Sequence, residues 1–201
     1  IGDPTGTNKT RPQLTLDETR ENAKSYIDQA TIVLSDKNLE VVYNSDWLSK
    51  LNFSDLIKVA SKYTVAQMLE RDDFTKRYSS GKPISLHEFL YPLAQGYDSV
   101  VIKSDIELGG TDQKFNLLVG RALQKEYDQS PQSFITAPLL EGTDGVEKMS
   151  KSNDNYIALT DSHDQMYGKV LSIPDSLILK YFEFCTEVSK EELSDYKNQL
   201  E

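Results

Sequence analysis

Short apolar strand patterns alternate along this chain with longer helical patterns, and this alternation constrains the fold more than any other feature. Leu39–Tyr43, Ile106–Leu108 and Phe134–Leu140 have strand patterns, and helical segments separate each from the next. Strands that alternate with helices indicate a parallel α/β sheet. In such sheets ligands bind at the carboxyl ends of the strands, so the segments that follow the strands are the first places to look for a site.

Helical periodicity and capping patterns predict the remaining elements. Helices are expected over these ranges: Leu16–Leu34, Ser54–Tyr63, Thr64–Glu70, Arg71–Ser79, Ser85–Asp98, Asp112–Glu126, Asp164–Ser172, Asp175–Phe184 and Ser189–Leu200.

Length and charge narrow the function classes. The 201 residues suffice for one substantial domain or a domain with an insertion. A net charge of −10 argues against a general nucleic-acid binder, and a basic group at 71–82 has the pattern of a solvated helix face. The single cysteine, Cys185, cannot form an internal disulfide, which fits a reducing, cytoplasmic setting. No apolar stretch is long enough to span a bilayer.

The predicted Ser85–Asp98 helix carries three polar side chains in one row. Tyr91, Gln95 and Asp98 recur at i, i+4 and i+7, opposite an apolar face that contains Leu93. A phenol, an amide and a carboxylate in one row can hold a small polar molecule. From the pattern alone, a solvated outer face is the simpler interpretation.

Two glycines follow the Ile106–Leu108 strand and precede a helix. Gly109 and Gly110 allow a backbone to approach a ligand closely, and the helix start behind them offers free N–H groups to an anion. Asp112 could bond ribose hydroxyls there. The alternative is a tight turn capped by Thr111 or Asp112, and the G-x-G-x-x-G dinucleotide pattern is absent.

The segment Lys148–Ser152, with the sequence K-M-S-K-S, is the most specific signal in the chain. Two lysines three residues apart on a loop with small hydroxyl residues suit a clamp on a polyphosphate, because each ammonium is a compact charge that can follow a leaving group. An exposed basic turn is the alternative interpretation. A match over five consecutive residues favours the functional one.

This loop matches, letter for letter, the signature loop of class I aminoacyl-tRNA synthetases, and four further segments resemble the tyrosyl-tRNA synthetases in order and spacing. These segments are Ile1–Gly6, Asn44–Trp47, Tyr91–Asp98 and Gly109–Gln113. The likeness covers essentially the whole chain and is strongest to the bacterial enzymes that keep the full loop. It implies a Rossmann-like parallel sheet, as a truncated class I catalytic domain, with a helical insertion and C-terminal helices.

The resemblance implies a tyrosine site and an ATP site. Asp98 would accept a hydrogen bond from the substrate phenol. Other residues would bind the substrate ammonium and carboxylate groups: Asp3, Tyr91 and Gln95, with Asn44 in support, and Gln113. A third set would bind ATP: Gly110 and Asp112 at the ribose, Leu140 and Met149 at adenine, and Lys148 and Lys151, the two catalytic residues, at the pyrophosphate.

The resemblance also implies the reaction, its cofactors and its partners. Tyrosine would be activated with ATP, accompanied by Mg²⁺, to tyrosyl-adenylate and then transferred to tRNA(Tyr). No tightly bound cofactor or protein-held metal is expected. Four segments follow from the likeness: 1–46 and 85–155 as the two parts of the nucleotide-binding fold, 47–84 as a helical insertion, and 156–201 as the start of a helical domain.

In the family such an insertion forms a homodimer interface and touches the tRNA acceptor end. An apolar surface is expected from Phe53, Ile57, Val65, Met68 and Leu69, and tRNA contacts from Arg71, Lys76 and Arg77. For any one of these residues, local packing is an equally good interpretation.

Some family features differ or lie elsewhere. The H-I-G-H element is not in this sequence, whose two histidines are His87 and His163, and it is expected upstream of Ile1. Both chain ends are therefore expected to be truncations, and the isolated piece is expected to bind weakly or be inactive. Thr7 stands where many relatives carry Lys. Two other interpretations remain: a tryptophanyl-tRNA synthetase, and a binding or regulatory protein that kept the fold without catalysis.

Overall fold

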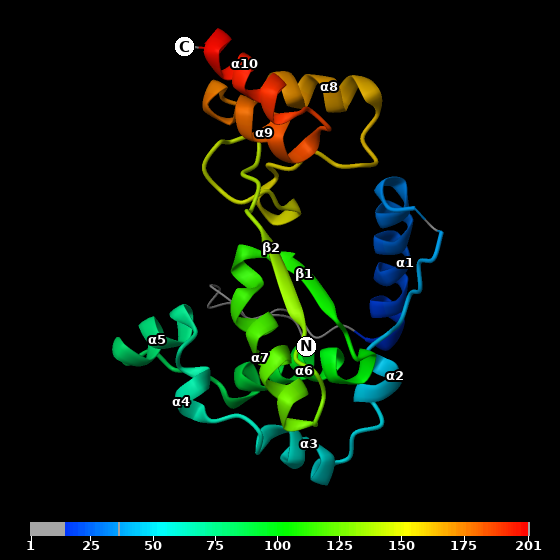
Figure 1. The fold of residues 1–201 in the computed structure, drawn as a ribbon, viewed down its shortest axis with the longest axis vertical. Coiled ribbons are helices and arrows are strands. Elements are labelled where there is room, and N and C mark those ends of the chain that lie inside the picture. The colour runs from blue at the N-terminus through cyan, green and yellow to red at the C-terminus, as the bar shows by residue number, and fades with distance from the viewer. Residues whose placement is uncertain (1–14, 36, 201) are drawn as a thin grey trace. The chain divides into compact units, whose positions relative to one another are not determined.

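The computed structural model describes residues 15–35 and 37–200, which form parts of two compact units. Of the described residues, one unit holds 15–16 and 39–137, and the other holds 17–35, 37–38 and 138–200. Figure 1 shows the elements of both units along the chain. Each unit is described below by itself.

The first unit holds the described residues of the predicted tyrosine site and contains a βαβ arrangement. Strand β1 (Ile106–Gly110) pairs in parallel with β2 (Ser133–Ala137), with Leu108 opposite Ile135. The turn η1 (Thr111–Gln113) and helix α7 (Lys114–Glu126) connect them. The parallel sheet predicted from the sequence is thereby confirmed. Five further helices precede β1: α2 (Ser45–Leu48), α3 (Phe53–Ala60), α4 (Val65–Met68), α5 (Asp72–Ser79) and α6 (Leu86–Ile102).

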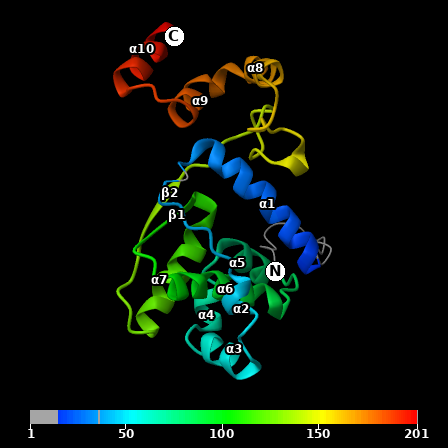
Figure 2. The same cartoon turned by 90° about the vertical axis from the view of Figure 1, so that its right-hand side faces the viewer.

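Helices α6 and α7 pack closely, and this contact fixes the helix that carries the polar row (Figure 2). A Cβ added at Gly96 would lie 2.9 Å from Val119 Cγ1 and 3.1 Å from the backbone nitrogen of Gly120, so a larger residue at position 96 would push the helices apart. Leu93 and Leu123 join the same apolar core. The position of α6 is therefore set by packing along its length.

Two predictions about the first unit are wrong. Leu39–Tyr43 is not a strand, because in the described part of the chain it pairs with no other segment, and an extended segment without a hydrogen-bonding neighbour forms no ladder. Met68 is 3% exposed and belongs to the core with Val59, so it cannot contribute to an exposed apolar surface. Phe53 and Val65, by contrast, are exposed as expected.

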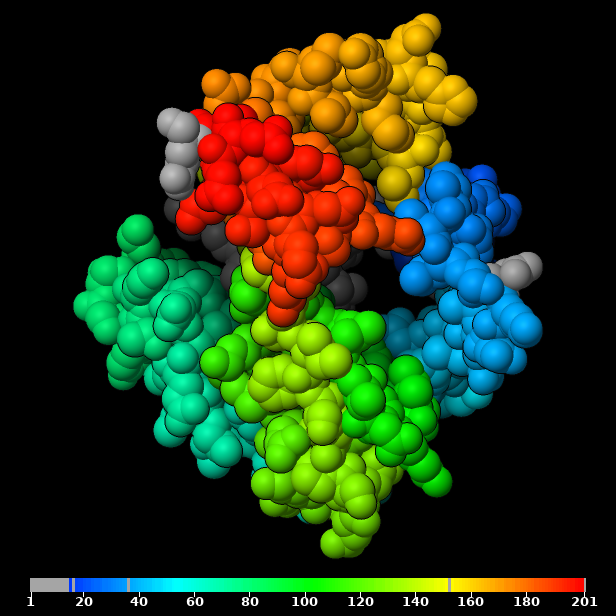
Figure 3. All heavy atoms as spheres, turned by 45° about the horizontal axis from the view of Figure 1, so that its top comes forward, coloured from blue at the N-terminus to red at the C-terminus, as the bar shows by residue number. Residues whose placement is uncertain are grey.

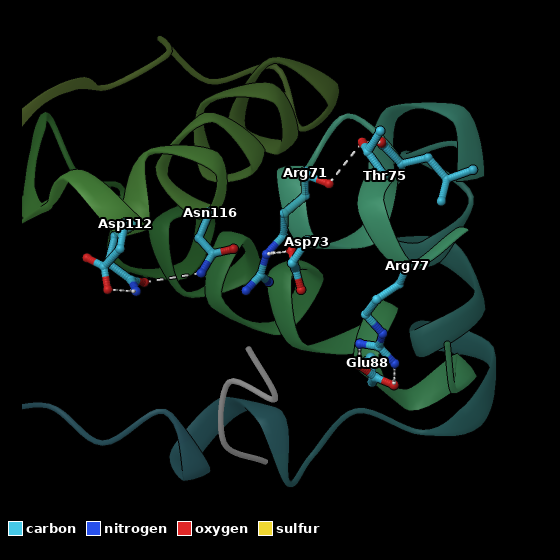
Figure 4. A network of polar contacts seen from close by, with 9 residues as sticks. Arg71, Asp73, Thr75, Arg77, Glu88, Asp112 and Asn116 are labelled. Carbon is cyan, nitrogen blue, oxygen red and sulfur yellow. Dashed lines mark hydrogen bonds and ion pairs between the residues drawn. The ribbon is translucent and has the colours of Figure 1, made fainter. Parts of the chain in front are cut away.

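Ion pairs fix α5 against its surroundings (Figure 4). Arg71 is 7% exposed, with its Nε atom 2.8 Å from Asp73 Oδ1 and its guanidinium over the Phe74 ring. Arg77 binds both carboxylate oxygens of Glu88 on α6, with Nη2 2.9 Å from Oε1. Both arginines therefore have structural partners, and the interpretation of the 71–82 group as a solvated face is wrong for them.

Replacing Arg77 with methionine is expected to lower the free energy of unfolding by about 2 kcal/mol, because the largely buried Glu88 would lose its charged partner. The hydrogen bond from Arg77 lowers the pKa of Glu88, so this stabilisation is present above the pKa of the unfolded chain and is lost as pH falls through the folded pKa. Urea unfolding at neutral and acidic pH measures both effects. The exposed neighbour Lys76 gives the control Lys76→Met, and equal losses in the two variants would contradict the prediction.

The second unit is mainly helical. It holds most of α1 (Leu16–Val33), together with η2 (Lys151–Asn153), α8 (His163–Leu171), η3 (Asp175–Leu177), α9 (Ile178–Cys185) and α10 (Lys190–Leu200). Helices α9 and α10 are in contact, and the rings of Phe182 and Tyr196 lie 4.9 Å apart between centroids. In Figure 3 the orange and red atoms of this part of the chain pack together. Of the helices described, none combines the length and apolar character needed to cross a bilayer.

Candidate active site

The carboxylate of Asp98 is held by two donors from a short helix far away in sequence. Trp47 Nε1 donates to Asp98 Oδ1 at 2.7 Å, and Asn44 Nδ2 donates to Oδ2 at 3.2 Å. Asn44 is the residue before α2, and Trp47 lies within it, so one helical turn aims both side chains at α6. Burial raises the pKa of Asp98, and the two donors act against that rise. The site is thus a half-buried carboxylate whose orientation is fixed.

One turn earlier on α6, a buried acceptor has no donor. Gln95 Oε1 is inaccessible to solvent, and within the described ranges it has no hydrogen-bond partner. A buried carbonyl oxygen without a donor costs about 1–3 kcal/mol, which a ligand N–H group would recover. Tyr91 lies four residues before Gln95 on the same face of the helix. The row predicted from the sequence is therefore half-buried and is not a fully solvated face.

The turn after β1 presents an amide and a carboxylate. Asn116, 2% exposed, donates from Nδ2 to Gln113 Oε1 at 3.1 Å, and Gln113 Nε2 lies 3.5 Å from Asp112 Oδ2 (Figure 4). The bond from Asn116 fixes the orientation of the Gln113 amide. Its nitrogen carries two N–H groups, so one of them can donate to an anionic ligand group. Gly110 is the last residue of β1 and leads directly into this turn.

The lysine loop of the second unit is a tight hairpin. Met149 N donates to the carbonyl oxygen of Leu140 at 2.9 Å, and Glu141 and Lys148 form an antiparallel bridge. The structure thus brings together Leu140 and Met149, the two residues expected at adenine. Lys148 and Lys151 are exposed, and Lys151 begins η2.

Helix α9 anchors the base of this hairpin. Lys180 forms an ion pair with the carboxylate of Glu141, and Tyr181 donates from its hydroxyl to the Glu141 backbone oxygen at 2.8 Å. The hydrogen bond from Lys180 lowers the pKa of Glu141. The loop that carries the lysines is therefore fixed at its start by two side chains of one helix.

The sequence patterns do not identify three residues that organise these groups. These are Trp47, Asn116 and Asn155, whose Oδ1 accepts from the Ser150 backbone N–H in the lysine loop. Trp47 was only part of a matching segment, although a lone tryptophan beside Asn44 was a signal that its indole N–H had a partner. Asn116 and Asn155 lie within helical or loop patterns that give no sign of their contacts. Among the predicted site residues, Asp3 lies outside the described part of the chain, as does Thr7. The described residues contain no cluster of three or more His, Cys, Asp or Glu side chains that could hold a metal ion.

Comparison with known families places this arrangement in a class. Residues 1–201, the whole chain, match the family described as tRNA synthetases class I (W and Y). The chain therefore belongs to this family of class I aminoacyl-tRNA synthetases.

Tyrosine–tRNA ligases are among the curated proteins that this chain resembles in sequence. The chain is 60% identical over 201 residues to the one from Carboxydothermus hydrogenoformans, and 64% identical over 182 residues to the one from Chlorobaculum tepidum. It covers 49% of the first and 45% of the second, so it spans about half the length of the curated relatives it matches.

Solved structures show the same fold. A C-terminally truncated mitochondrial tyrosyl-tRNA synthetase from Aspergillus nidulans matches 98% of this chain and 62% of its own, with a TM-score of 0.66 and 22% identity. The tyrosyl-tRNA synthetase from Archaeoglobus fulgidus, solved with L-tyrosine, matches 80% of this chain and 50% of its own, with a TM-score of 0.65 and 23% identity. The Rossmann-like class I catalytic fold predicted from the sequence is confirmed.

Proposed function

We propose that this chain is the central catalytic part of a tyrosine–tRNA ligase that acts in the cytoplasm. The observation that carries the proposal is the Asp98 carboxylate, held at 2.7 Å by Trp47 and at 3.2 Å by Asn44. A carboxylate with two fixed donors keeps further lone pairs for a ligand hydroxyl, and a phenol supplies one.

The other groups of α6 and the β1 turn suit the rest of an amino acid. Gln95 Oε1, which is buried without a donor in the described chain, would accept from the ammonium group, together with Tyr91 and Asp3. Gln113 Nε2 would donate to the substrate carboxylate. Gly110 and Asp112 would take the ribose of ATP. Recognition then rests on complementary hydrogen bonds at both ends of the substrate.

The activation step needs no general base, because the substrate carboxylate is already ionised at neutral pH. One of its oxygens attacks the α-phosphorus of ATP, a P–O bond forms, and the bond to pyrophosphate breaks. Lys148 and Lys151 would stabilise the charge that grows on the leaving pyrophosphate. Mg²⁺ would arrive with the nucleotide, and Leu140 and Met149 would contact adenine. A ribose hydroxyl of the 3′-terminal adenosine of tRNA(Tyr) would then attack the acyl carbon, an ester would form, and AMP would leave.

The segment 47–84 is proposed as the insertion that pairs two copies of the protein. Phe53, Ile57 and Val65 supply its exposed apolar side chains, with 77%, 53% and 63% of their surfaces accessible. Exposed apolar groups of this size favour a protein contact. The same proposal includes the segment boundaries at 46/47, 84/85 and 155/156. It also includes contact between the insertion and the tRNA acceptor end.

Tyrosine-dependent exchange of pyrophosphate into ATP tests the proposal directly. The full-length protein is expected to catalyse exchange with L-tyrosine and to show far less with L-tryptophan or L-phenylalanine. Exchange that depends on tryptophan would favour a tryptophanyl-tRNA synthetase. Absence of exchange with any amino acid, in a protein that still binds tyrosine, would favour a binding protein that lost catalysis.

A further inference from the structure

We propose that Asn155 is a positioning residue that holds the backbone of the hairpin at residues 140–155, and so places the ammonium groups of Lys148 and Lys151 for pyrophosphate departure. The inference rests on the proposed function, since it concerns the lysines of that reaction. It concerns a residue four positions beyond the second lysine, outside the matching K-M-S-K-S segment.

The carboxamide of Asn155 joins the two sides of the hairpin from inside it. Asn155 is 3% exposed, and its Oδ1 accepts from the Ser150 backbone N–H at 2.9 Å. Its Nδ2 donates to Asp144 Oδ2 at 2.6 Å and lies 3.2 Å and 3.3 Å from the carbonyl oxygens of Glu147 and Lys148. One side chain thus bonds the backbone on both sides of Met149, between the two lysines.

The backbone packs closely around Asn155. Thr143 N donates to the Asn155 carbonyl oxygen at 2.9 Å. A Cβ at Gly142 would lie 2.3 Å from both the Cγ and the carbonyl oxygen of Asn155, well inside van der Waals contact. The absence of a side chain at position 142 is therefore what allows Asn155 to enter the hairpin.

Asp144 completes the arrangement as an ionised partner. Its Oδ1 accepts from the backbone N–H groups of Val146 and Glu147, each at 2.9 Å. The bond from Val146 and the bond from Asn155 lower the pKa of Asp144, so its contact with Asn155 is a charge-assisted hydrogen bond. This contact ties Asn155 to the turn that precedes Lys148.

A neutral amide is the right group for this position. A lysine ammonium sits on a flexible four-carbon stem, so its location depends first on where the backbone holds its Cα atom. Asn155 supplies both donors and acceptors to that backbone without adding a charge that would compete for the lysines. An aspartate of nearly the same shape would lose the donor and set a second carboxylate against Asp144.

The test compares three full-length variants that disturb this arrangement by different routes: Asn155→Ala, Asn155→Asp and Gly142→Ala. The control is Gly168→Ala in α8 of the same unit, where an added Cβ would meet no atom within 4 Å. The measurements are kcat and tyrosine KM in pyrophosphate exchange, and the rate of trypsin cleavage after Lys148 and Lys151 without ligands.

In the three variants kcat is expected to fall by about 10- to 100-fold, because a small displacement of catalytic groups has an effect of this size. Tyrosine KM should stay unchanged, and trypsin should cleave the loop faster. Gly168→Ala should match the wild type. In a double variant with Lys148→Ala, Asn155→Ala should add less than its separate effect, because it acts through that lysine.

Three results would overturn the inference. The first is wild-type kcat in Asn155→Ala, whatever the cleavage rate. The second is a matching loss of tyrosine affinity, which would indicate general disruption. The third is full additivity with Lys148→Ala. A wild-type protein without tyrosine-dependent exchange would instead reject the proposed function, and the cleavage rates would still report whether Asn155 fixes the loop.

Discussion

Replacing Lys151 with alanine in the full-length enzyme is expected to lower kcat for tyrosine activation by about 10²–10³-fold, the usual effect of removing one preorganised charge donor from a transition state. The exposed ammonium of Lys151 would act on the leaving pyrophosphate and not on tyrosine, so tyrosine affinity should stay constant. Pyrophosphate exchange and equilibrium binding of tyrosine separate the two quantities.

Lys190 provides a matched control, because it is an exposed lysine of the same unit at the start of α10. Lys190→Ala should keep wild-type kcat, while Lys148→Ala should behave like Lys151→Ala. Equal kcat in Lys151→Ala and Lys190→Ala would contradict the assignment of the loop to the pyrophosphate.

Replacing Asp98 with alanine is expected to lower kcat/KM for tyrosine by about 10- to 100-fold, since a hydrogen bond to a charged group contributes about 1.5–3 kcal/mol. Phenylalanine has no hydroxyl to pair with the wild-type carboxylate, so removing that carboxylate does not weaken its binding further. The ratio of kcat/KM for tyrosine to kcat/KM for phenylalanine should therefore fall in the variant. Rejection of phenylalanine by tyrosyl-tRNA synthetases is the standard example of this effect, and we take the direction from it, not a magnitude.

The pH dependence of tyrosine binding follows from the same carboxyl. Burial raises the pKa of Asp98, so on acidification the ionised acceptor is lost at a higher pH than for an ordinary aspartate. Its contribution to stability has the opposite course: it is fully present below the unfolded pKa and is lost as pH rises through the folded pKa. Asp98→Asn should flatten both profiles.

Asp105 supplies the control for these measurements, because its side chain is exposed and belongs to none of the site contacts described above. Asp105→Ala should leave tyrosine kinetics and their pH profile unchanged. Unaltered tyrosine kinetics in Asp98→Ala would refute the role given to this carboxylate.

Local sequence patterns predicted the features that depend on neighbouring residues in the sequence. The helix that became α6, its row of Tyr91, Gln95 and Asp98, and the strand that ends in Gly109 and Gly110 all follow from periodicity and turn chemistry. Most predicted helix limits lie within three residues of those in the structure, α6 extending further, to Ile102.

Contacts between distant segments could not be predicted from one sequence. Trp47 and Asp98 are 51 residues apart, and no periodic pattern relates them. The same limit explains the wrong expectation for Met68: helical spacing shows which residues share a face, but it does not show whether another helix covers that face. Leu39–Tyr43 failed for a related reason, because strand propensity needs a neighbouring strand to be realised.

The crowding of Gly142 against Asn155 has a consequence for comparative genomics. A side chain at position 142 would overlap both the amide and the backbone carbonyl oxygen of residue 155, so a smaller residue at 155 alone would not make room for it. A relative that acquires a larger residue at 142 should therefore have a different backbone path here and should brace its lysine loop by some other means.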